Sequence, residues 1–599
     1  MRTPRAAKRL AGRAALLAAA LVLAGVGRPA SERPADEFLL ERDVAVPMRD
    51  GVVLRADIWR PRGAGRCPVL VYRTPYDKQA AQEDYTIFRR AVERGYAVVI
   101  QDVRGRYASA GEFRPYQQEG RDGYDTIEWA ARQPWSNGAV GTFGLSYPGA
   151  VQWLAAKERP PHLKAMAPAM TFSSPRNFFY SGGVFDLSWI GWIWNNIAPH
   201  ARLRQNLPGP KTYAEARAEW VRRRDRLRGH LPLRELPDLK EVAPYYYEWM
   251  SHPPEDRWWE WCELRGHYEK IDAAVLNLSG WYDEAYGPEG ALTNFLGLAA
   301  ARRHRRELRA KLVIGPWSHG VEETRSTAAG LRQFGPQAAI DYDEVVLRWM
   351  DRYVKGVENG VDREKPVEVF VMGRNSWERA ETWPLPGTRS TPLYLAAPAA
   401  PGEHGRLRWS QPAEAESFRS FLSDPANPVT DLHPPYSGAQ DYRAMAHRPD
   451  VLIYETPPLE NDLEVTGPIT AEIYLGCDAP DTDLWVRLLD VAPDGTALNL
   501  MSPGLDLLRA SYRQPGRRRR LAPGRVYKLE LTNLVTSNVF RRGHRLRVQI
   551  SSSFFPHFSR NLHTGESEVS SAETRQARLR IYHNRHHPSR LLLSVRGPH

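Results

Sequence analysis

The sequence predicts an α/β protein in which a parallel-sheet domain is interrupted by a helical insertion and followed by an all-β domain. Short apolar runs alternate with amphipathic stretches up to residue 170, and again from 273 to 360, as in a doubly wound sheet. Residues 171–272 lack strand patterns. From about residue 366, period-two alternation and turn signals dominate.

Length and composition describe a large globular protein. A chain of 599 residues is too long to fold around a single hydrophobic core, so several domains are expected. The formal net charge is +12, but the basic runs at 302–306 and 517–520 are interpreted as solvated faces, so no nucleic-acid partner is expected. The three cysteines lie far apart, without disulfide or metal-ligand spacing.

The N-terminus has the layout of a secretory signal peptide. Basic residues precede the apolar run Ala14–Val26, and Gly27-Arg28-Pro29 follows it. As a helix this run would be about 20 Å long, short of a bilayer core. We expect residues 1–30 to be removed, leaving a secreted or periplasmic bacterial protein without a stable membrane span. The alternative is an uncleaved membrane anchor.

The first α/β segment, residues 36–170, begins with a β-hairpin closed by Arg49-Asp50-Gly51 and continues as alternating strands and helices. Ligands bind at the carboxyl ends of the strands in such sheets. Tyr76, Asp102 and Ser146 each follow a predicted strand end. The predicted strands are 39–46, 52–59, 67–72, 97–100 and 139–143, and a helix is predicted at 122–133.

The turn from Gly144 to Gly149 has the pattern of a nucleophile elbow. It joins the apolar strand 139–143 to the amphipathic stretch Val151–Lys157, with Ser146 at its centre. Such a turn lifts the serine hydroxyl out of the sheet and places the next backbone N–H at a helix N-terminus, where it can stabilise an oxyanion. Pro148 stands where a small residue is usual, and proline is tolerated in the first turn of a helix. The alternative is an ordinary glycine–serine turn.

The insertion at 171–272 is interpreted as a helical cap. Its aromatic excess could line a substrate pocket, or could pack the cap onto the sheet. Eight of the 19 tryptophans lie here: Trp189, Trp192, Trp194, Trp220, Trp249, Trp258, Trp259 and Trp261.

The α/β pattern resumes at 273–360 with two strands that end in polar side chains. Strand 274–279 is followed by Asp283, and strand 311–314 by His319. The chain order Ser146, Asp283, His319 is that of α/β-hydrolases. A histidine removes the serine proton and later donates it to the leaving group, while a carboxylate fixes the histidine tautomer.

The C-terminal segment, residues 366–599, is predicted to be a two-sheet jelly-roll. The adjacent His586 and His587 have no partner cluster, which favours a surface loop over a metal site. The strand candidates are Val367–Val371, His544–Ile550, Arg578–Tyr582 and Leu591–Val595.

The chain resembles the cocaine esterase (CocE/NonD) family of serine hydrolases, which is related to X-prolyl dipeptidyl peptidases, glutaryl acylases and α-amino acid ester hydrolases. The resemblance covers nearly everything after the signal peptide. It is based on the motifs at 73–78, 101–106, 111–113, 122–125, 133–138, 144–149, 280–283, 315–319, 538–547 and 551–561.

The resemblance implies a role for each site residue. Ser146 is the nucleophile, His319 the base and Asp283 the acid that orients it. The oxyanion hole consists of the backbone N–H of Tyr147 and the hydroxyl of Tyr76, and a phenol is a suitable donor for such an anion. The mechanism needs neither a metal nor an organic cofactor.

We therefore expect a secreted serine hydrolase that cleaves acyl esters, with amides as a further option. The alternatives are an X-prolyl dipeptidyl peptidase-type peptidase, a β-lactam acylase, and, from another class, a non-catalytic carbohydrate-binding protein on a hydrolase scaffold. Amino acid ester hydrolases carry a glutamate at the position of Pro148 and a cluster of acids just after the position of Asp283. In this chain that second stretch is Glu284-Ala285-Tyr286, with a single acid, so free α-amino substrates are not expected. The expected partner is a small ester or amide, and the oligomeric state stays open.

Overall fold

The computed structural model of the chain describes residues 38–63, 65–174, 178–434, 437–502, 504–514 and 516–597. The predicted signal peptide, residues 1–30, lies outside these ranges and stays a prediction. Among the helices of the described residues, none combines the length and the apolar character needed to cross a membrane.

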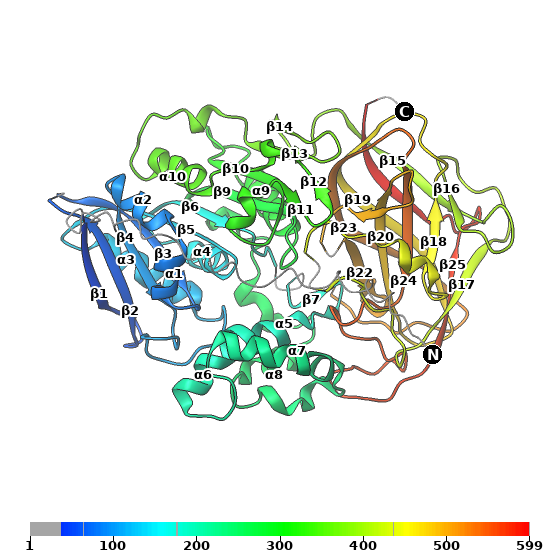
Figure 1. The fold of residues 1–599 in the computed structure, drawn as a ribbon, viewed down its shortest axis with the longest axis horizontal. Helices are drawn as coiled ribbons and strands as arrows, with labels where there is room; N and C mark the ends of the chain where they lie inside the picture. Colours follow the sequence, from blue (N-terminus) through cyan, green and yellow to red (C-terminus); the bar gives the residue numbers. More distant parts are fainter. Residues whose placement is uncertain are drawn as a thin grey trace, which may run out of the picture.

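A ten-stranded sheet forms the α/β part (Figure 1). Its seven middle strands, from β4 to β13, are parallel, and the hairpin β1–β2 and strand β14 extend it with antiparallel pairing. In spatial order the strands are β1 (Phe38–Pro47), β2 (Val53–Pro61), β4 (Ala97–Asp102), β3 (Cys67–Thr74), β5 (Ser136–Leu145), β6 (Leu163–Ala169), β9 (Ala274–Tyr282), β10 (Ala310–Ser318), β13 (Val367–Val371) and β14 (Ser376–Ala380).

Helices cover both faces of this sheet, each over its own hydrophobic core. The buried side chains of α3, α4 and α9 belong to one core, and those of α1, α2 and α10 to the other. Central strands such as β3, β4 and β9 are buried along their whole length, as their apolar runs predict. The helices are α1 (Lys78–Asp84), α2 (Ile87–Glu93), α3 (Glu119–Ala131), α4 (Tyr147–Lys157), α9 (Glu289–Ala301) and α10 (Tyr342–Tyr353).

The insertion between β6 and β9 is mostly helical and lies beside both the sheet and the C-terminal strands (Figure 1). A small hairpin, β7 and β8, was not predicted from the sequence and starts this cap. The cap hydrogen-bonds to the C-terminal part through Leu187 N–H to His557 O (2.8 Å) and Ser559 N–H to Phe185 O (2.8 Å). Its elements are β7 (Tyr180–Ser181), β8 (Val184–Phe185), α5 (Ser188–Trp192), a π-helical turn (Ile193–Ile197), α6 (Ala198–Gln205), α7 (Tyr213–Gly229) and α8 (Pro244–Ser251).

The C-terminal part is a β-rich domain whose strands form one hydrogen-bonded network. Whether this network is a two-sheet jelly-roll stays a prediction. Its strands are β15 (Thr388–Ala396), β16 (Gly405–Arg408), β17 (Phe418–Ser423), β18 (Leu452–Glu455), β19 (Leu463–Cys477), β20 (Asp483–Val491), β21 (Ala497–Asn499), β22 (Leu505–Arg509), β23 (Val526–Phe540), β24 (Arg545–Ser551), β25 (Ala577–Tyr582) and β26 (Arg590–Arg596).

One strand lies in a different sheet from the one expected. Val367–Val371, assigned from its alternation to the C-terminal domain, is β13 and pairs in parallel with β10 of the α/β sheet. Its antiparallel neighbour β14 closes that sheet, and the β-rich network starts only at β15. Alternation of apolar and polar residues indicates a half-buried strand but not the strand with which it pairs. The sequence pattern of Val367–Val371 therefore fits the α/β sheet as well as the C-terminal domain.

Candidate active site

The turn around Ser146 has the geometry of a nucleophile elbow. Ser146 lies between β5 and α4 with φ 68° and ψ −125°, a strained backbone conformation for a residue with a side chain. Close packing explains the two glycines: a Cβ at Gly144 would lie 2.5 Å from Pro148 Cβ, and one at Gly149 would lie 2.7 Å from Ala169 O. Pro148 thus packs against Gly144. It also fits the first turn of α4, where a backbone N–H would have no intrahelical acceptor.

Asp283 and His319 meet at the carboxyl ends of β9 and β10. Asp283 is fully buried, and its Oδ1 accepts the hydrogen of His319 Nδ1 at 2.8 Å. The backbone N–H groups of Ala285 (3.1 Å) and Tyr286 (3.4 Å) donate to the same oxygen, which fixes the carboxylate. This arrangement leaves Nε2 of His319 as the nitrogen that can accept a proton.

Ser146 and His319 line the same pocket, of about 380 Å³. Tyr76 also lines it, so three of the predicted site residues surround one cavity at the strand ends. Seven further aromatic side chains among the described residues line the pocket: Tyr72, Tyr85, Tyr116, Phe178, Trp189, Trp192 and Tyr286. Trp189 and Trp192 are thus pocket residues, whereas the other six tryptophans of the cap do not line it.

The hydroxyl of Tyr76 is oriented by the cap. Trp192, at the end of α5, donates its indole N–H to the Tyr76 oxygen at 2.9 Å. Burial raises the pKa of Tyr76 well above its ordinary value, so the phenol keeps its proton. With its oxygen already accepting a hydrogen bond, Tyr76 has its O–H free to donate into the pocket. An oxyanion on a substrate attacked by Ser146 is the acceptor that suits it.

The second predicted oxyanion donor, the backbone N–H of Tyr147, is the first of helix α4 and has no intrahelical acceptor. The side chain of Tyr147 anchors this residue. Its hydroxyl donates to Glu119 Oε1 (2.7 Å) and accepts the backbone N–H of Tyr116 (3.1 Å). Glu119 in turn pairs with Arg73 at 2.9 Å, so a buried charged chain holds the oxyanion side of the turn.

Arg106 connects the core to the cap behind the oxyanion site. It is buried and donates to the carbonyl oxygens of Pro75 (2.8 Å), Ile197 (3.1 Å) and Asn196 (3.2 Å). Pro75 precedes Tyr76, and Asn196 follows Trp192 within the same helical segment. Arg106 therefore holds together the two segments that carry the phenol and its indole donor.

Two acids near the predicted site have structural partners. Asp102, at the end of β4, accepts the backbone N–H groups of Lys78 (2.8 Å) and Ala108 (3.3 Å), and burial raises its pKa to about 7. Glu284 accepts the backbone N–H of His319 at 3.1 Å, which fixes the histidine loop. Among the described residues, no cluster of three or more His, Cys, Asp or Glu side chains could hold a metal.

The charge around His319 predicts the acid limb of a pH–rate profile. Burial favours the neutral imidazole, but the carboxylates of Asp283 and Glu284 outweigh it and raise the pKa of His319 above 6.5. Since a protonated histidine cannot act as the base, we expect kcat/KM to fall about tenfold per pH unit below a midpoint that lies above 6.5. Glu284→Gln keeps the acceptor for the His319 N–H but removes a charge, so the midpoint should move to lower pH. An unmoved midpoint in that variant would contradict this account.

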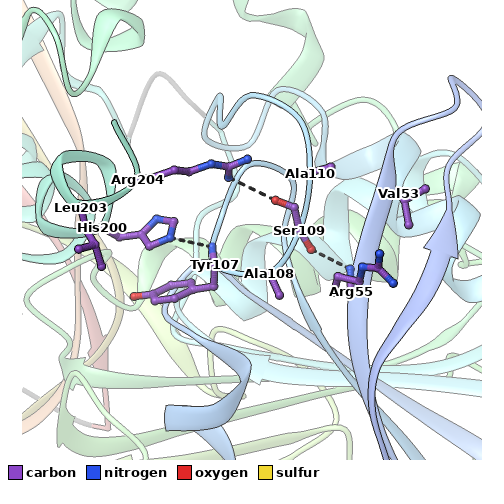
Figure 2. Close-up of a pocket in the computed structure, with 9 residues that line it drawn as sticks. All are labelled: Val53, Arg55, Tyr107, Ala108, Ser109, Ala110, His200, Leu203 and Arg204. Carbon is purple, nitrogen blue, oxygen red and sulfur yellow. Dashed lines mark hydrogen bonds between the residues drawn. The ribbon is translucent and has the colours of Figure 1, made fainter. Parts of the chain in front are cut away.

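A second hollow, of about 430 Å³, lies between the loop after β4 and helix α6 (Figure 2). In it His200 Nε2 accepts the backbone N–H of Tyr107 (3.1 Å), and Arg204 donates to the Ser109 carbonyl (3.3 Å). Burial lowers the pKa of His200 to about 4, so its imidazole is neutral. The described residues that line this hollow include none of the predicted site residues, so the pocket at Ser146 is the candidate active site.

The sequence is similar to those of known proteins. Residues 50–321 match the family described as X-Pro dipeptidyl-peptidase (S15 family), and residues 359–592 match its C-terminal non-catalytic domain. Cocaine esterase of Rhodococcus sp. (strain MB1 Bresler) is 34% identical over 589 residues, which cover 93% of this chain and 99% of the relative.

Two solved structures share the fold. An α-amino acid ester hydrolase superposes with a TM-score of 0.79 at 24% identity, covering 96% of this chain and 100% of the other. An aminopeptidase from a marine sediment archaeon (Thaumarchaeota archaeon) also gives a TM-score of 0.79, at 23% identity, covering 96% of this chain and 99% of the other. The α/β-hydrolase fold with a C-terminal β-rich domain is thereby established for this chain.

Proposed function

The chain belongs to the cocaine esterase family of serine hydrolases, and we propose that it cleaves carboxylic esters with compact, apolar acyl groups through an acyl-enzyme on Ser146. The observation that carries the proposal is the pocket of about 380 Å³, which Ser146, His319 and Tyr76 line together with several further aromatic side chains. This volume is near the lower end of ligand pockets, which favours compact substrates.

The proposed reaction has two halves. Ser146 Oγ attacks the acyl carbon while its proton passes to His319 Nε2, and the negative carbonyl oxygen is held by Tyr76 and the Tyr147 N–H. His319 then protonates the leaving alkoxy oxygen as its bond to carbon breaks. In the second half a water molecule attacks the acyl carbon while its proton passes to His319 Nε2. The bond from that carbon to Ser146 Oγ then breaks, the acid leaves, and His319 returns the proton to Ser146 Oγ.

The alternative substrates make different demands on the pocket. A glutaryl group needs a cation for its carboxylate, and none of the described residues that line the pocket is Lys or Arg. An aminoacyl-prolyl peptide needs a carboxylate for its terminal amine, and Asp186 lies in the pocket wall. Asp186 accepts the Ser188 N–H at 2.7 Å and lies 3.7 Å from His557 Nε2, so an aminopeptidase remains the second candidate.

A substrate panel tests this proposal. We would compare kcat/KM for nitrophenyl acetate, butyrate and benzoate with that for aminoacyl-prolyl and glutaryl nitroanilides. The esters are expected to exceed both amides by more than about 10²-fold. Preference for the aminoacyl-prolyl amide would establish the second candidate. Hydrolysis of none of these substrates would favour a non-catalytic carbohydrate-binding role.

We also propose that the protein is exported and that residues 1–30 are removed. The support is the basic start and the apolar run Ala14–Val26. Export predicts that fractionation of bacterial cells expressing the full chain finds the protein outside the cytoplasm, with a new N-terminus near residue 30. An intact N-terminus in the membrane fraction would instead show an anchor.

A further inference from the structure

Tyr286 lies between the catalytic loop and the cap. It follows Asp283 by three residues, and its backbone N–H donates to the Asp283 carboxylate (3.4 Å). Its ring stacks on Phe178 of the cap, with centroids 4.8 Å apart and planes at 20°. The His319 ring lies 5.7 Å from it on the catalytic side. The side chain is thus held beside the catalytic histidine.

Tyr286 lines the same pocket as Ser146 and His319. The hydroxyls of Tyr116 and Ser146 interact with its phenol and partly offset the effect of burial on its pKa. Tyr116 is buried and lines the same pocket. Burial raises the pKa of Tyr286 to about 12, so the phenol carries its proton at neutral pH.

Tyr286 therefore repeats the arrangement found at Tyr76. Both are phenols that line the pocket at Ser146, and in both burial raises the pKa, so the O–H keeps its proton and can donate to an acceptor in the pocket. The positions differ, because Tyr76 follows β3 whereas Tyr286 lies on the acid's own loop beside His319. Since His319 must reach the leaving oxygen to protonate it, that oxygen departs on the side where Tyr286 lies.

We propose that Tyr286 is a further catalytic residue whose O–H donates a hydrogen bond to the alkoxy oxygen as it leaves the tetrahedral intermediate. The proposal rests on the esterase function proposed above. When the carbon–oxygen bond breaks, its electron pair stays on the alkoxy oxygen, and this oxygen receives the proton held on His319. Tyr286 keeps its own proton and stabilises the negative charge that develops before the transfer is complete.

The benefit of such a hydrogen bond depends on the alcohol. A nitrophenolate is stable in water and needs little help to leave, whereas an alkoxide develops a concentrated charge. Loss of the Tyr286 hydroxyl should therefore be felt most by esters of simple alcohols. A residue that only shapes the pocket has no reason to distinguish between them.

The experiment is a leaving-group series. We would measure kcat/KM, which reports acylation, for esters of one acid with nitrophenol, phenol, trifluoroethanol and ethanol. Tyr286→Phe is expected to lower kcat/KM about 10- to 100-fold for the ethyl ester and less than about threefold for the nitrophenyl ester. Tyr76→Phe, which removes an oxyanion donor, should lower the whole series alike, by about 10²- to 10³-fold.

A third variant serves as the control for loss of a buried hydroxyl. Tyr246, a buried cap tyrosine outside the pocket, makes no hydrogen bond through its hydroxyl among the described residues, so Tyr246→Phe should match the wild type. An equal loss for all alcohols in Tyr286→Phe, or no loss, would overturn the role of Tyr286. Failure of the wild type to turn over any ester would instead contradict the proposed esterase function.

Discussion

Ser146→Ala is expected to lower kcat for ester hydrolysis by about 10⁶-fold, the largest effect we predict for any side chain of this protein. The alanine keeps the strained turn, since φ 68° is imposed by β5, α4 and the close packing at Gly144 and Gly149. The oxyanion donors and the imidazole remain, but no nucleophile is left for His319 to activate. Single-turnover and steady-state assays with a nitrophenyl ester measure the loss.

A fluorophosphonate probe tests the same residue independently of substrate choice. The wild type should gain a single adduct, which peptide mass mapping places on Ser146, and Ser146→Ala should gain none. Ser570→Ala, at an exposed serine of the C-terminal part, is the matched control and should label like the wild type. An adduct on another serine, or activity that survives in Ser146→Ala, would refute the assignment of the nucleophile.

Local sequence patterns were sufficient to predict that Ser146, Asp283 and His319 lie at the ends of neighbouring strands of the sheet. The elbow depends on glycines within three residues of Ser146, and Asp283 and His319 each follow a buried apolar run. In a parallel sheet the carboxyl ends of all strands share one edge, so residues far apart in the chain can be placed together from their strand positions alone. The structure brings Asp283 and His319 to 2.8 Å of one another, as that argument requires.

Contacts between the cap and the sheet could not be predicted in this way. Trp192 reaches Tyr76 across 116 positions of the chain, and Arg106 reaches Asn196 across 90. No periodicity relates such residues, because the path of the cap depends on tertiary packing. Tyr76 itself was identified through family resemblance, and Tyr286 was noted only as a departure from an acidic pattern. The partner of β13 was missed for a similar reason, since alternation does not specify which sheet a strand joins.

Residues of the cap position two tyrosines of the candidate site. The cap's Trp192 orients one phenol and its Phe178 holds another, so the cap contributes to the donor geometry as well as to the pocket wall. The C-terminal domain in turn holds the cap through backbone hydrogen bonds at His557 and Ser559. The β-rich domain thus holds the cap beside the candidate site and contributes no residue to the predicted triad.

Asp283→Ala is expected to lower kcat by about 10⁴-fold. Oδ1 of Asp283 holds the Nδ1 hydrogen of His319 and thereby keeps Nε2 ready to accept the serine proton. Without the carboxylate the tautomer is no longer fixed, and the imidazolium that forms during attack loses its counter-charge. Asp272→Asn, at an exposed acid with surface arginine partners, is the control and should keep wild-type activity.

Asp283→Asn should lose less than Asp283→Ala, about 10²-fold, because of the backbone around the acid. The N–H groups of Ala285 and Tyr286 donate to Oδ1 of Asp283. In the variant these two donors favour the amide oxygen at the position of Oδ1, so the amide nitrogen points away from His319. The Nδ1 hydrogen keeps its acceptor, the tautomer is preserved, and only the counter-charge is lost. If Asp283→Asn instead loses as much as Asp283→Ala, the amide nitrogen faces the imidazole and the histidine is held in the wrong tautomer. Comparing kcat for the two variants on one nitrophenyl ester, with thermal unfolding to confirm that both are folded, therefore measures how far these two backbone N–H groups determine the state of the catalytic histidine.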